Sequence, residues 1–171
     1  MIVTEPLTKI YIDKGFKYLK AHVIIPKLSG TLSFLGSSFI IQDVLRNPNQ
    51  RARGPYHRIM VGLSTLDLFV TISQSILTSW PMPSGYYIMA VGNVYTCDAA
   101  GFVASIGHYG IPLYNCALAT YFLLELKYSW GESRIKAAEK WFHIVPWMTG
   151  VVMAIVGLVT QSFGPVAQVC W

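Results

Sequence analysis

The sequence predicts an all-α membrane protein, built as a multi-pass bundle of four transmembrane helices. Three observations predict this class. Of the 171 residues, 53% are hydrophobic and only 12% are charged, the mean hydropathy is +0.45, and four segments are long and apolar enough to cross a bilayer. Because no internal repeat or low-complexity run divides the chain, we expect one transmembrane domain over residues 22–171. Residues 1–21 are expected to form an extracellular or interfacial segment.

The four expected spans are residues 22–45, 59–80, 96–130 and 142–163. About 20 apolar residues, at a rise of about 1.5 Å each, cross the hydrocarbon core of a bilayer. Lys27 and Asp43 lie near the ends of the first span, where their side chains can reach the interface. The third span would be about 50 Å long as a continuous helix, so it must tilt or project beyond the membrane.

The basic residues predict the orientation of the bundle. The connections after the first and third spans hold eight lysines and arginines, whereas the second connection and the C-terminal tail hold none. Five lysines precede or begin the first span. Since short cytoplasmic loops carry the excess of basic residues, we expect a plasma-membrane protein with its N-terminus outside.

The inner basic residues are expected to form one cytoplasmic face. Its minimum role is to attract anionic lipid, and coupling to a cytoplasmic partner is the further hypothesis. The expected members are Arg51, Arg53, His57, Arg58, Lys127, Arg134 and Lys136.

A single carboxylate, Asp67, interrupts the second span within the stretch VGLSTLDLFVTISQSIL. An ionisable group at this depth is costly and almost always faces the interior of a bundle or a water-filled cavity. We therefore expect an interior polar hub in which Asp67 bonds with Asn115, Ser37 and the adjacent Ser38. Two interpretations stay open: a neutral packing residue, or a hub or ion site whose protonation is linked to conformational change.

Other polar and aromatic residues lie toward the outer ends of the spans. They either line a ligand cavity or serve as ordinary interhelical contacts and interfacial aromatic residues. The candidates are Gln74, Tyr95, Asp98, His108, Tyr109, Gln161 and Trp171. The histidines have neither i,i+4 spacing between them nor an acidic partner set, and no phosphate-binding or hydrolase motif is present. We expect no enzyme, no cofactor, no metal site and no nucleic-acid partner.

The three cysteines fall in two environments. Cys97 opens the third span on the outside, Cys170 follows the fourth span on the same side, and Cys116 is expected to be buried in mid-helix. Only the first two share a compartment that permits a disulfide.

These features together look like the first half of a seven-helix G-protein-coupled receptor. The segments KLSGTLSFLGSSFIIQDVLRN, YHRIMVGLSTLDL, GIPLYNCALATYFLLELKYSW and EKWFHIVPWMTG resemble the protist receptor-like proteins grouped with the cAMP-receptor and secretin-like families. The resemblance covers about Pro26 to Trp171, and its specificity lies in the combination of motifs. It implies a disulfide between Cys97 and Cys170, with Trp171 as the adjacent family tryptophan and Asp67 as the polar hub.

The chain also departs from that family. In ELKYSW, Glu125 and Lys127 stand two residues apart where rhodopsin-like receptors carry an acid-arginine-tyrosine motif. The sequence ends after the fourth expected span, which predicts an incomplete or truncated receptor or a four-helix relative. The expected function is transmembrane signalling, with an unknown extracellular ligand and a heterotrimeric G protein or another cytoplasmic partner. The alternative is a four-helix membrane scaffold that binds other membrane proteins without sensing a ligand.

Overall fold

The computed structural model describes residues 5–46, 54–87, 89–166 and 169–171. Its helices are α1 (Glu5–Arg46), α3 (Pro55–Val70), α4 (Val94–Phe122) and α5 (Glu132–Val159). Two short π-helical segments, η1 (Thr71–Ile76) and η2 (Leu123–Lys127), continue α3 and α4. A two-residue antiparallel pair, β1 (Pro165–Val166) and β2 (Val169–Cys170), follows α5. The predicted all-α class is confirmed, since helices form most of the described chain.

Three stretches of the described chain are long and apolar enough to cross a membrane: Ile24–Arg46, Pro55–Ile76 and Ser133–Val159. The four-span prediction is met in part, because α4 is not among them. Although α4 has 29 residues, its glycines, tyrosines, His108 and Asn115 dilute its apolar content. The first stretch begins within helix α1, which runs from Glu5 through Pro26 without a break.

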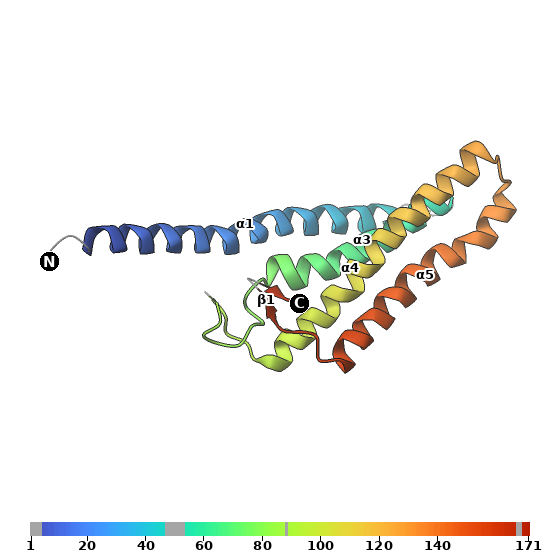
Figure 1. Cartoon of the computed structure of the whole chain (residues 1–171). Coiled ribbons are helices and arrows are strands. Elements are labelled where there is room, and N and C mark those ends of the chain that lie inside the picture. Colours follow the sequence, from blue (N-terminus) through green and yellow to red (C-terminus); the bar gives the residue numbers. More distant parts are fainter. Residues whose placement is uncertain (1–4, 47–53, 88, 167–168) are drawn as a thin grey trace.

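The helices form an antiparallel bundle in which α4 lies between α3 and α5 (Figure 1). Helix α1 packs along α3 and η1, and its N-terminal part extends beyond the other helices (Figure 1). Short connections between helices favour such antiparallel neighbours. The β1–β2 pair lies near the start of α4, at the end of the bundle that we call the disulfide end (Figure 1).

Glycines allow the helices to approach closely. A Cβ added to Gly107 on α4 would meet the side chain of Val70, and a Cβ on Gly150 of α5 would meet the carbonyl oxygen of Ile106. The adjoining core includes Leu66, which is fully buried. Small residues at such crossings are typical of helices that associate inside membranes, where packing rather than water exclusion drives contact.

Large apolar side chains cover the outer surfaces of α1 and α5. Leu32 and Phe39 of α1 are 72% and 69% exposed, and Val159 at the end of α5 is 76% exposed. Soluble domains rarely expose apolar patches of this extent. This surface fits a hydrocarbon environment better than water.

Candidate functional site

The carboxylate of Asp67 connects α3 to α1. Its Oδ2 accepts hydrogen bonds from the hydroxyls of Ser33, at 2.9 Å, and Ser37, at 2.6 Å. The two serines are one helical turn apart on α1, so their hydroxyls reach the same carboxylate oxygen. Ser37 is buried and Asp67 is half-buried. The predicted pair of Asp67 and Ser37 is thus brought together, and Ser33 is a partner that the sequence argument missed.

Asn115 and Cys116 lie outside this hub. Both are exposed on α4, whereas the neighbouring Tyr114 and Ala117 are buried. Residues three apart share one helix face, and it is the face of Tyr114 and Ala117 that packs against other helices. The predicted burial of Cys116 is therefore wrong, and Asn115 is placed on the exposed surface rather than beside Asp67.

A disulfide ties the C-terminal hairpin to the start of α4. The sulfur atoms of Cys97 and Cys170 are bonded and their Cα atoms lie 5.2 Å apart, within the expected geometry. The backbone amide and carbonyl groups of Gly164 and Trp171 exchange two hydrogen bonds of 2.9 Å, which close the hairpin. A capping box between Asn93 and Thr96 fixes the first turn of α4 beside this bridge. The position of Trp171 is thus determined by both covalent and backbone contacts.

Three of the predicted ligand-facing residues meet beside the C-terminal hairpin. The His108 Nε2 and Gln74 Oε1 atoms are 2.6 Å apart and share a hydrogen bond whose donor depends on the histidine tautomer. The ring of Trp171 packs edge-on against the ring of His108, with centroids 4.6 Å apart. In the described part of the chain, the buried Gln74 Nε2 has no hydrogen-bond partner. The outer cluster of Gln74, His108 and Trp171 therefore joins η1, α4 and the hairpin. The side-chain amide of Gln74 can still donate a hydrogen bond to a further acceptor.

The other predicted ligand-facing residues line two further hollows, one of which also includes Trp171. Tyr95, Asp98 and Gln161 line a groove of about 570 Å³ between the start of α4 and the end of α5. Tyr109 and Trp171 line a smaller hollow of about 230 Å³ on another part of the surface. The seven expected residues are thus divided among neighbouring surfaces instead of surrounding one cavity.

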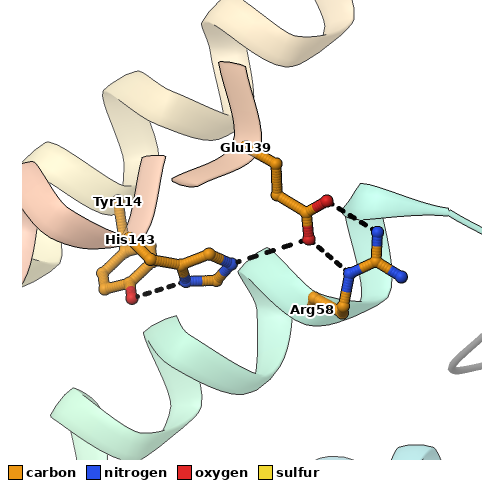
Figure 2. A network of polar contacts seen from close by, with 4 residues as sticks. All are labelled: Arg58, Tyr114, Glu139 and His143. Carbon is orange, nitrogen blue, oxygen red and sulfur yellow. Dashed lines mark hydrogen bonds and ion pairs between the residues drawn. The ribbon is translucent and has the colours of Figure 1, made fainter. Parts of the chain in front are cut away.

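A network of polar contacts joins α3, α4 and α5 at the opposite end of the bundle (Figure 2). The Arg58 guanidinium forms a two-point ion pair with the Glu139 carboxylate, in which Nη2 donates to Oε2 at 2.6 Å and Nε donates to Oε1. His143 Nε2 lies 3.9 Å from the same carboxylate. His143 Nδ1 and the Tyr114 hydroxyl share a hydrogen bond of 2.9 Å. We call these four residues the inner network.

The tyrosine of the inner network is closely packed. Tyr114 is fully buried, and a Cβ added to Gly62 of α3 would overlap its phenol ring. The glycine therefore leaves the space that the tyrosine side chain fills. An arginine–carboxylate pair with two parallel hydrogen bonds has a defined geometry as well as favourable energy. The network can hold the three helices in one arrangement.

The sequence argument missed Tyr114, Glu139 and His143 as site residues. The one local signal is the i,i+4 spacing of Glu139 and His143, which places them on one face of a helix. Nothing local connects them to Arg58, which lies 81 residues from Glu139. The contact depends on the packing of α3 against α5.

The predicted cytoplasmic face is described only in part. Arg51 and Arg53 fall outside the described residues. Lys127, Arg134 and Lys136 are exposed, and His57 is half-buried with its ring edge-on to Tyr56. Arg58 was expected to face a partner, but its side chain turns to Glu139 on α5.

The described residues contain no group of three or more histidine, cysteine or acidic side chains that could hold a metal ion. Comparisons with models of protein families, with curated proteins and with solved structures find no match. Arguments about function therefore rest on this chain's own residues.

Proposed function

We propose that this chain belongs to a multi-pass membrane protein of the receptor type, with its disulfide end outside the cell. Its function would be to couple an extracellular ligand to a cytoplasmic partner such as a heterotrimeric G protein. The exposed apolar surfaces of α1 and α5, together with three helices of sufficient length and hydropathy, support a place in a membrane. The full-length protein would then respond by shifting the equilibrium between two helix arrangements.

The observation that carries the proposal is the outer cluster. The hairpin is held by the disulfide and places Trp171 on His108, and His108 shares a hydrogen bond with Gln74 on η1. A ligand that contacts this cluster would act at once on the hairpin, on α4 and on the end of α3. Since α4 also carries Tyr114 of the inner network, one helix connects the two ends.

The test asks whether a change at the outer cluster reaches the opposite end. Cys116 is replaced by serine, and Arg134 on the exposed start of α5 is replaced by cysteine as a reporter thiol. We expect Trp171→Ala to change the alkylation rate of that thiol severalfold in the membrane-embedded full-length protein. Val152→Ala, on the exposed surface of α5, is the matched control and should leave the rate unchanged.

An unchanged alkylation rate with Trp171→Ala would contradict the receptor proposal, because coupling between two sites requires that each affects the other. That outcome would favour a scaffold that binds other membrane proteins through its apolar surfaces. Topology is tested separately: an antibody should reach an N-terminal tag on intact cells, but a tag in the connection before α5 only after permeabilisation.

A further inference from the structure

An apolar groove lies between η1 and the start of α4 at the disulfide end. It has a volume of about 530 Å³. Its lining includes Ile72, Leu77 and Trp80, from η1 and the connection after it, and Ala99 and Val103 from α4. The small side chain of Ala99, which is exposed, leaves the space open. This groove is distinct from the outer cluster, whose residues do not line it.

The groove begins where the helices end and continues toward mid-bundle. Trp80, Pro81 and Gly92 belong to the connection between η1 and α4, whereas Thr96 and Val103 are on α4 itself. Thr96 and Val103 are seven residues apart, or about 10 Å along a helix. In a membrane, the groove would run from the interfacial region into the hydrocarbon of one leaflet.

A positive charge lies beside Trp80, one of the residues that line the groove. Lys27 of α1 donates a hydrogen bond of 2.8 Å from its Nζ to the Ile76 carbonyl oxygen, and its Nζ lies 4.4 Å from the centre of the Trp80 ring. A cation is favoured at this position because the last carbonyls of a helix carry partial negative charge. The ammonium group has three donors, of which two reach the carbonyl oxygens of Ile76 and Leu77, at 2.8 Å and 3.4 Å, so the third can meet an anionic oxygen at the interface.

We infer that this groove binds a phospholipid of the leaflet at the disulfide end, with one acyl chain in the groove and the phosphate near Lys27. An apolar channel that ends beside a tryptophan and a lysine matches the chemistry of a lipid, which has an apolar chain below an anionic phosphate. Tryptophan and lysine are also the side chains that favour the interface. The inference rests on the proposed membrane location but is independent of receptor activity.

The test uses the full-length protein in phosphatidylcholine vesicles that contain a small fraction of anionic phosphatidylglycerol with a photoreactive diazirine in one acyl chain. Carbonate extraction first checks that the protein is integrated. After illumination, peptide mapping should find labels concentrated on residues 71–77 and 94–103. The exposed apolar residues of α5, such as Val152 and Ile155, should be labelled less.

Two variants identify the groove as the cause. Ala99→Phe fills the groove and should remove most of the concentrated labelling. Ala119→Phe makes the same change at another exposed position of α4 and should not. Lys27→Gln keeps a donor for the carbonyl but removes the charge, so it should lower labelling about fivefold, the effect of one basic residue near an anionic headgroup.

The outcomes separate the two proposals. Equal labelling of the groove and of α5, or equal effects of the two phenylalanine variants, would overturn the groove site while leaving the membrane location intact. No effect of Lys27→Gln would overturn the phosphate contact. Failure of the protein to integrate into vesicles would overturn both the site and the proposed membrane location.

Discussion

The ion pair between Arg58 and Glu139 should contribute measurably to the stability of the bundle. We expect Glu139→Gln to lower the free energy of unfolding by about 2 kcal/mol. The change removes the charge from a carboxylate that accepts two hydrogen bonds from the guanidinium. Hydrogen bonds to charged groups contribute about 1.5–3 kcal/mol each, and a fully buried pair loses about 3–5 kcal/mol when one partner is removed. The Arg58 side chain is 32% exposed and that of Glu139 is 13% exposed, so water and the retained amide recover part of this loss.

The measurement is unfolding by sodium dodecyl sulfate in mixed micelles, followed by tryptophan fluorescence. A double-mutant cycle isolates the pair, with Arg58→Met as the second change. We expect a coupling energy of about 1.5 kcal/mol between the two positions. Arg134→Met, which removes an exposed arginine near the start of α5, is the matched control and should change stability by less than about 0.5 kcal/mol.

Additive effects of Glu139→Gln and Arg58→Met, within about 0.4 kcal/mol, would refute this reasoning. Such additivity would mean that the two side chains do not act together in the folded bundle. The stated coupling would instead establish that α3 and α5 are joined through this pair.

Three other changes test the remaining contacts by the same unfolding measurement. Asp67→Leu should lower the free energy of unfolding by about 1 kcal/mol because both serine hydroxyls lose their acceptor, whereas Asp67→Asn should lower it by less than half of that. A stabilising effect of Asp67→Leu would argue against the hub. Cys97→Ser should leave Cys170 open to alkylation and lower the free energy of unfolding by about 2–4 kcal/mol. In the unchanged protein, non-reducing peptide mapping that finds both cysteines alkylated would exclude the bridge. Gly150→Val should destabilise the bundle by about 1–3 kcal/mol because its Cβ would overlap a backbone carbonyl, but Gly36→Ala, at a helical site with open space, should be neutral or stabilising. Equal effects of the two variants would mean that helix packing is not close at Gly150.

The sequence predicts the features of this fold that depend on local composition. Apolar length predicts the helices, and a lone carboxylate in an apolar span predicts an inward contact to Ser37. The shared side of Cys97 and Cys170, together with the family resemblance, predicts their pairing. The first two of these predictions need only the position of a residue along its own helix, whereas the pairing also needed the resemblance.

The features that the sequence does not predict depend on how one helix is rotated against another. Asn115 and Cys116 lie on α4, as expected, but on its exposed side. Arg58 lies at the expected end of α3, but its partner becomes apparent only when α5 is placed beside α3. A charge scan along the chain counts Arg58 and Glu139 separately and cannot show that they neutralise each other.

This pairing bears on the predicted orientation. Of thirteen lysines and arginines, eight were assigned to the cytoplasmic side and five to the outside. One residue of each group has a contact described above: Arg58 binds Glu139, and Lys27 binds the carbonyl oxygen at the end of η1. Leaving these two residues out lowers both groups by one, so the difference of three is the same as before. The positive-inside argument for an outside N-terminus is therefore unchanged by these contacts, because they draw equally on both sides of the bundle.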